Sequence, residues 1–160
     1  MTTLSDITLF DIVEIGVPPY SARGITESFA PIQGAGQLFR DINGTLQDLG
    51  ATQFRKVQLT VTCTDMDSPA LDGVWPGMTL TIECQTEMSY RSSTGGTPAH
   101  SVVSGSSRTG LLAADDGGGD DGFTYYRPTF SMKVLDYSIG TADGWDGNVG
   151  VNWQLKLEEV

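Results

Sequence analysis

The sequence is poor in the side chains that most enzymes and metal proteins rely on. Its 160 residues include one histidine, His100, and two cysteines, Cys63 and Cys84. A zinc site usually takes four Cys or His ligands, and a Ser or Cys nucleophile needs a base held beside it. His100 lies in a Ser/Gly-rich stretch that offers nothing to fix its ring. We therefore expect no catalytic residues, no metal and no cofactor.

Long apolar runs and basic charge are also scarce. No apolar stretch approaches the roughly 18 residues of a membrane span, and Met1–Phe10 lacks the basic flank of a signal peptide. Nine Lys and Arg residues stand against 20 Asp and Glu, a net charge of −11. Nucleic acids are bound by basic side chains that displace counterions, so this charge argues against nucleic-acid and anionic-membrane partners. We expect folding in a reducing cytosol, with both cysteines as thiols.

Glycine, by contrast, is abundant. There are 20 glycines in 160 residues, against an average share of about 7%. Threonine, serine and valine are plentiful too, and stretches rich in Ala, Glu, Lys and Leu are missing. This composition is typical of β-strands joined by tight turns.

Three segments alternate apolar and polar residues with a period of two, which predicts half-buried strands. They are Val57–Thr64, Met78–Met88 and Val149–Leu157, and a fourth strand is expected at Thr129–Ile139. Both cysteines fall on apolar faces and are predicted to be buried. If the first two segments paired as a hairpin, Cys63 would lie opposite Met78 or Leu80. Cys84 would then lie about four residues further along the strand, on the order of 13 Å away and too far for a disulfide.

The first fifty residues are predicted to be extended as well. We expect strands at Ile7–Val17 and Gly24–Ile32. The pair Asn43-Gly44 predicts a type I′ hairpin turn that pairs Leu38 with Leu49. The whole pattern predicts an all-β fold in a single domain, an antiparallel β-sandwich or barrel of seven to nine strands.

The segment 91–122 stands apart in composition, being rich in Ser, Gly, Thr, Pro and Asp. We expect a long mobile loop inserted between core strands. Its acidic run could attract calcium, but the ligand spacing of an EF-hand is missing, so a solvated acidic loop is the preferred interpretation. The residues of that run are Asp115, Asp116, Asp120 and Asp121.

Four aromatic residues lie near expected turns or strand ends: Trp75, Tyr125, Tyr126 and Trp145. Exposed rings could stack on sugars, as in carbohydrate-binding modules. They could anchor a subunit interface, where Trp and Tyr are enriched, or they could be ordinary core residues. The sequence leaves these three interpretations open.

Three stretches together carry a family resemblance. They are Phe39–Leu49 continuing into Gln53–Lys56, Ser68–Gly77, and Tyr126–Pro128 with the closing Val151–Val160. They resemble small all-β virion proteins encoded among the structural genes of tailed bacteriophages and prophages. The resemblance implies a non-enzymatic virion component that is made in the bacterial cytoplasm and binds itself and other virion proteins.

Two virion parts fit this resemblance. A tail-tube subunit, the favoured one, stacks as rings whose long loops bridge neighbours and whose acidic lumen lets DNA slide. A capsid decoration protein is the alternative, and a carbohydrate-binding β-sandwich module is the alternative from another class. Edge pairing by residues 1–17 and 149–160 is the expected assembly mode. The interface candidates are Trp75, Tyr125, Tyr126, Trp145, Asp115, Asp116, Asp120 and Asp121.

Overall fold

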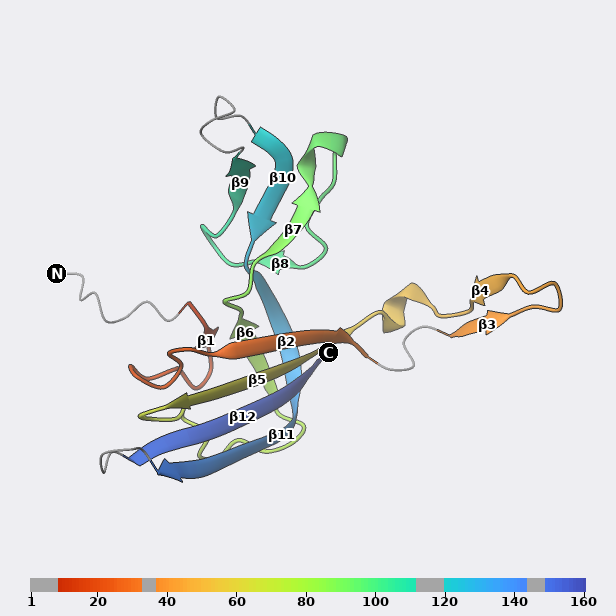
Figure 1. The fold of residues 1–160 in the computed structure, drawn as a ribbon. Coiled ribbons are helices and arrows are strands. Elements are labelled where there is room, and N and C mark those ends of the chain that lie inside the picture. The colour runs from red at the N-terminus through yellow and green to blue at the C-terminus, as the bar shows by residue number, and fades with distance from the viewer. Residues whose placement is uncertain (1–8, 33–36, 112–119, 144–148) are drawn as a thin grey trace.

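The computed structural model describes residues 9–32, 37–111, 120–143 and 149–160. Within these ranges the chain is nearly all β, with antiparallel sheets that form a curled half-barrel, as the sequence predicted (Figure 1). The only helical elements among the described residues are two 3₁₀ turns, η1 (Thr52–Phe54) and η2 (Ser92–Thr94).

The principal sheet has seven strands. Six form a continuous path and the seventh, β8 (Ser101–Val102), pairs with the start of β11. In spatial order the path is β1 (Asp11–Ile12), β6 (Thr79–Glu83), β11 (Pro128–Asp143), β12 (Val149–Glu159), β5 (Val57–Asp65) and β2 (Thr26–Pro31).

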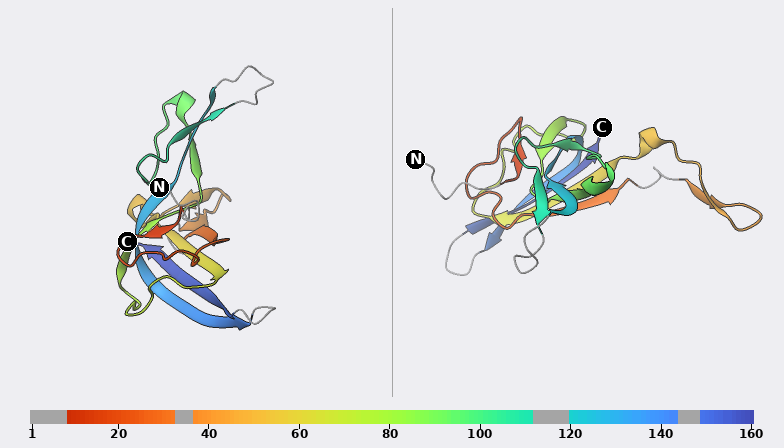
Figure 2. Two further views of the ribbon diagram at one scale, coloured as in Figure 1. Left: turned by 90° about the vertical axis from the view of Figure 1, so that its left-hand side faces the viewer. Right: turned by 90° about the horizontal axis from the view of Figure 1, so that it is seen from above.

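Two smaller sheets project from this body (Figures 1 and 2). One has three strands, β7 (Met88–Arg91), β10 (Asp120–Tyr126) and β9 (Arg108–Leu111), and lies above the principal sheet in Figure 1. The other is a two-stranded hairpin of β3 (Leu38–Arg40) and β4 (Leu46–Asp48) that extends sideways.

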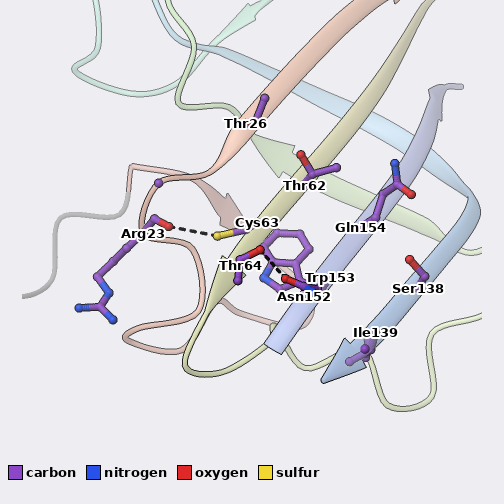
Figure 3. A pocket seen from close by; sticks show the side chains of 12 residues that line it. Arg23, Thr26, Thr62, Cys63, Thr64, Ser138, Ile139, Asn152, Trp153 and Gln154 are labelled. Carbon is purple, nitrogen blue, oxygen red and sulfur yellow. Dashed lines mark hydrogen bonds between the residues drawn. The ribbon is translucent and has the colours of Figure 1, made fainter. Parts of the chain in front are cut away.

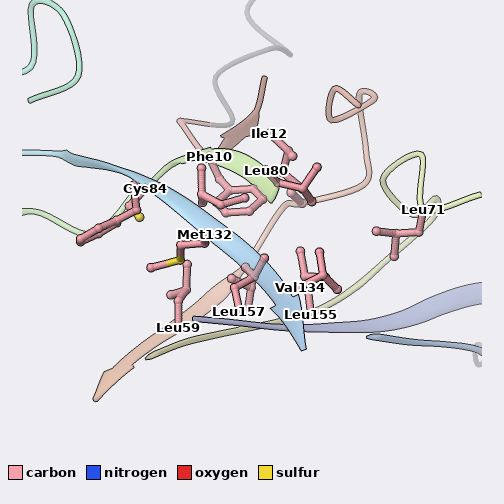
Figure 4. Close-up of a cluster of buried hydrophobic side chains, with 14 of the residues drawn as sticks. Phe10, Ile12, Leu59, Leu71, Leu80, Cys84, Met132, Val134, Leu155 and Leu157 are labelled. Carbon is pink, nitrogen blue, oxygen red and sulfur yellow. The ribbon is translucent and has the colours of Figure 1, made fainter. Parts of the chain in front are cut away.

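The core fills the hollow of the curled sheet. Alternate residues of β5, β6, β11 and β12 point inward and meet the side chains of β1 and its neighbours (Figure 4). The largest fully buried side chains are Phe10, Ile12, Leu59, Leu71, Leu80, Ile82, Met132, Leu155, Leu157, Val61, Val74 and Val134.

Strand β12 lies in the middle of the sheet, between β11 and β5. The expectation that residues 149–160 form a free edge is therefore wrong. The reason is the burial of Leu155 and Leu157, which are 0% exposed and need apolar neighbours on both flanking strands. The edges of the path belong to β1 and β2 instead.

The two cysteines are free and buried, as predicted. The hairpin considered for 57–64 and 78–88 does not form, because β12 and β11 lie between β5 and β6. The Cys63 thiol donates to the backbone oxygen of Arg23 over 3.1 Å. Burial raises the pKa of both thiols, so neither is a ready nucleophile.

The turn at Asn43-Gly44 also differs from the prediction. Leu38 pairs with Asp48 rather than Leu49, and the loop runs from Asp41 to Thr45. Asp41 explains the longer loop, because its carboxylate accepts the N–H groups of Asn43 and Thr45 over 2.8 and 3.0 Å. Only Gly44 of the two turn residues has a positive φ, +81°, whereas a type I′ turn needs two.

The segment 91–122 is not one long loop, although residues 112–119 lie outside the described part. It contains η2, the short strand β8, the strand β9 and the beginning of β10. The many Gly and Ser residues concealed these strands, because their backbone pairing with β10 and β11 does not require apolar alternation.

The loop before β2 is fastened to β5 by a partly buried ion pair. The Asp65 carboxylate, with a side chain 3% exposed, accepts the Arg23 guanidinium at 2.7 Å and the Arg23 backbone N–H at 2.8 Å. The guanidinium also lies over the Tyr20 ring, 4.6 Å from its centroid. Burial alone raises the pKa of Asp65, but the hydrogen bonds from Arg23 and the Met66 N–H outweigh it and leave the pKa below its ordinary value.

We predict that Leu155→Ala lowers the free energy of unfolding by about 2–5 kcal/mol, because it opens a cavity at a fully buried position. Leu38→Ala is the matched control, since that leucine is 63% exposed on the hairpin. It should change stability by no more than about 0.5 kcal/mol. Urea unfolding of both variants measures this, and equal losses would contradict the described core.

The Asp65 ion pair predicts an acid-dependent contribution to stability. Because the folded pKa lies below the ordinary 3.8, the contribution is present above that value and is lost as the pH falls through the folded pKa. At pH 7, Asp65→Asn should cost about 1–3 kcal/mol.

This difference between wild type and Asp65→Asn should shrink in unfolding curves recorded below about pH 4. Asp67→Asn, an exposed carboxylate two residues away, serves as the control and should show no such convergence. If wild type and Asp65→Asn differ in free energy of unfolding by the same amount at every acid pH, the Asp65 carboxylate does not stabilise the fold through its ion pair with Arg23.

Candidate functional site

The most unusual feature of the molecule is the projecting hairpin, which we call the arm and define as residues 37–56. It leaves the sheet after β2 and returns into β5, and the Ile32 N–H donates to the Lys56 oxygen over 3.0 Å at its base. The Leu49 N–H donates to the Gln37 oxygen over 2.8 Å, one step beyond the β3–β4 register. Figures 1 and 2 show the arm extending away from the body.

The arm is stiffened by local polar contacts at several points. Asp41 orders the tip, and the Arg40 guanidinium donates to the Gly44 oxygen over 2.9 Å. Near the base, Arg55 pairs with Asp48 at 3.1 Å, and the Lys56 ammonium donates to the Val160 oxygen over 2.8 Å. These contacts shape the arm without providing it with an apolar core.

Large apolar side chains of the arm are exposed to solvent. All residues of β3 and β4 are exposed, and no residue of η1 is buried. Six large side chains are each at least 43% exposed: Leu38, Phe39, Ile42, Leu46, Leu49 and Phe54. Because these side chains are exposed, the arm lacks an apolar partner within the described chain. An isolated two-stranded hairpin is only marginally stable in water.

Both faces of the arm carry apolar residues. The register pairs Leu38 with Asp48 and Arg40 with Leu46, which places Leu38 and Leu46 diagonally on one face. Phe39 faces the other way, opposite Gln47. A partner can therefore cover the arm from either face.

The arm also differs from the body in charge. Residues 37–56 contain three basic residues, Arg40, Arg55 and Lys56, and two acidic ones, Asp41 and Asp48, a formal net charge of +1. Since the chain totals −11, the rest of it carries −12. The arm is thus a slightly basic apolar element on a strongly acidic body.

A second exposed apolar feature lies at the other end of the principal sheet, and we call it the notch. It is a cavity of ≈ 510 Å³ between the loop after β5 and the last part of β11. Ile139 is 49% exposed there, whereas Leu71 is 1% exposed and continuous with the core. The notch is lined by Ser68, Pro69, Ala70, Leu71, Asp72, Tyr137 and Ile139.

A pocket of ≈ 650 Å³ forms a polar depression on the strands near Arg23 (Figure 3). Thr26, Thr62, Gln154 and Ser138 form one row across β2, β5, β12 and β11. Thr64 hydrogen-bonds to Asn152 in the row beside it. Hydroxyl and amide groups dominate this surface.

This pocket has no acid–base pair for catalysis among its described lining residues. Its titratable groups are Arg23 and the buried Cys63, whose thiol pKa is raised by burial and, secondarily, by Asp65. Trp153 underlies the pocket but belongs to the core and is only 2% exposed, and its indole N–H donates to the Ser21 oxygen over 2.7 Å. No aromatic platform for a sugar ring is open there.

The predicted aromatic candidates are scattered. Trp75 is 70% exposed in the loop before β6. Tyr125 lies on β10 with the Arg108 guanidinium 4.5 Å above its ring, and Arg108 in turn pairs with Glu87. Tyr126 is 2% exposed and packs edge-on against Tyr90, so it is a core residue and not an exposed interface anchor.

The predicted acidic candidates form no site in the described chain. Asp121 accepts the Phe123 N–H over 2.8 Å, and Asp120 begins β10. Asp115, Asp116 and the aromatic Trp145 lie outside the described residues. No cluster of three or more His, Cys, Asp or Glu side chains suited to a metal ion occurs in the part of the chain that the structure describes.

His100 is held more firmly than expected. Its ring packs on Phe130 with centroids 4.8 Å apart, so the fold fixes a residue that the sequence placed in a loose loop. Among the described residues, no helix has the length and apolar character needed to cross a membrane.

The arm and the notch were not among the predicted interface residues. The sequence predicts a hairpin around Asn43-Gly44 but does not show that its apolar residues lie outside the core. The sequence signal that could have found the arm is that large apolar residues fall on both faces of a short hairpin, whereas a strand of the sheet would carry them on one.

Comparisons with known proteins identify no relative of this chain. A scan of protein-family models finds no match, and searches of curated proteins and of solved structures find none either. The features that bear on function are therefore the arm, the notch and the charge distribution of the chain itself.

Proposed function

We propose that this chain is a non-enzymatic structural protein of a bacteriophage virion, a tail-tube-type subunit that assembles with copies of itself into rings. The observation that carries the proposal is the arm, an ordered hairpin with six exposed large apolar side chains. The sequence resemblance to phage virion proteins supplies the biological setting.

Energetics support an assembly role for the arm. Burying one Leu or Phe side chain contributes about 1.5–3 kcal/mol, so covering several of them on a partner supplies a large driving force. Contiguous exposed apolar surface on a soluble protein marks an interaction site. The arm has this surface at the end of an extension, where it reaches beyond its own body.

Charge supports the tube in particular. A body with a formal charge of −12 repels the phosphate backbone, which suits a channel through which DNA must slide without sticking. The polar pocket, with its rows of Thr, Ser, Asn and Gln side chains, offers a weakly interacting surface of the same kind.

A capsid decoration protein is the alternative within the same setting, with the arm binding a capsid lattice instead of a second copy. A carbohydrate-binding module fits less well. Of the described aromatic candidates, Trp75 is 70% exposed, Tyr126 is buried, and the Tyr125 ring is covered by Arg108.

Negative-stain electron microscopy of the purified protein at high concentration tests the proposal. We predict rings or short tubes of uniform bore. The triple variant Leu38→Ser, Ile42→Ser and Leu46→Ser should stay folded and remain monomeric, because its exposed apolar surface is reduced without disturbing the core.

The matched control is Phe123→Ser, which removes a large side chain of 40% exposure from β10. It should assemble like wild type. Wild-type protein that remains monomeric at every concentration contradicts the tube proposal, and if it then binds phage capsids it supports decoration. Rings formed by the triple variant would show that the arm is not the assembly element.

A further inference from the structure

We propose that the notch of one subunit receives the arm of a second copy, so that subunits join head to tail. The inference rests on the proposed function and specifies its contact: the arm face that carries Leu38 and Leu46, with Ile42 at the tip, enters the apolar notch beside Ile139 and Tyr137 of the next copy.

The two surfaces lie at opposite ends of the body. The arm leads into β5 at Val57, and the loop that forms the notch follows β5 after Asp65. Nine strand residues at about 3.3 Å each separate these ends by about 30 Å. Since the arm points away from the body, it reaches a neighbour's notch and not its own (Figure 1).

The notch has the chemistry to accept the arm. Its floor is continuous with the hydrophobic core through Leu71, and Ile139 and the partly buried Tyr137 form one wall. Of these groups, Ile139 is the one that is open to solvent in the single chain, at 49% exposure. An incoming Ile42, fully exposed at the arm's tip, would bury against them.

Charges on the two surfaces are complementary. Arg40 at the tip of the arm and Asp72 at the notch form no ion pair with any residue that the structure describes. Asp67 and Asp136 are exposed close in sequence to notch residues and add to the negative field. With Asp41 beside Arg40 the tip is neutral in formal charge, and it is the Arg40 guanidinium that can meet Asp72 and so favour this occupant over an acidic partner.

This contact uses different surfaces on the two copies, so it is heterologous. Heterologous contacts propagate and close into a ring when the rotation between subunits permits it. Each subunit in a closed ring is then held by its own arm and by its neighbour's. Two modest contacts per subunit thereby give a stable assembly.

Disulfide trapping tests the pairing. Ile42→Cys and Ile139→Cys are made in separate chains, mixed at assembling concentration and oxidised. The native thiols are buried and do not interfere. We expect covalent dimers from the mixture, little product from either variant alone, and a ladder of multimers when both cysteines are in one chain.

Phe123→Cys replaces Ile139→Cys in the matched control and should give no dimer with Ile42→Cys. Efficient dimers from Ile42→Cys alone would show a symmetric arm-to-arm contact and overturn the proposal. Assembly of the wild type without cross-linking at the notch would overturn the docking site but leave the proposed function standing. Absence of wild-type assembly contradicts both.

A charge exchange gives an independent readout. Arg40→Asp and Asp72→Arg should each weaken assembly several-fold in sedimentation velocity, and the double variant should recover most of the loss. Arg91→Asp, an exposed arginine on β7, controls for the change in net charge and should assemble normally. If the double variant shows only the product of the two single losses, Arg40 and Asp72 do not meet.

Discussion

The fold depends on rows of buried side chains that run across β12 and its neighbours. One row joins Phe29, Leu59, Leu157 and Val134 through successive strands, and the next joins Val61 and Leu155. These rows fix the register, because a slip of one residue would turn every apolar side chain of a strand to the polar face. The positions of the arm and the notch follow from that register.

The arm is a pair of strands that packs on no hydrophobic core. β2 and β5 pair over a buried core, whereas β3 and β4 pair alone and expose their leucines. Local contacts around Asp41 and Asp48 give this extension a definite shape. It is an ordered element whose apolar surface is left for another molecule, which is the physical basis of the assembly proposal.

Much of the body could be predicted from the sequence, because period-two alternation is a local signal. The strands containing Leu59, Ile82, Val134 and Leu155 were located from the sequence. The choice of neighbouring strands could not be predicted, since alternation states which face is buried and not which strand lies beside it. That is why β12 was placed at an edge.

The candidate site was the harder part to predict. Tyr126 and Trp75 look alike in sequence, yet one is 2% and the other 70% exposed, because exposure depends on which elements pack over a residue. The notch likewise depends on the tertiary arrangement, since it brings residues 68–72 against Tyr137 and Ile139 of β11. Ile139 was predicted as an ordinary strand residue, and only the tertiary arrangement leaves it uncovered.

The central claim is that the arm is uncovered in the single chain and is covered by another copy on assembly. Hydrogen–deuterium exchange of the amides between Leu38 and Leu49, measured in dilute and in concentrated protein, tests this directly. The account predicts fast exchange in the dilute monomer and strong protection at high concentration, with β12 protected in both. Arm amides that exchange at the same rate at all concentrations would contradict it.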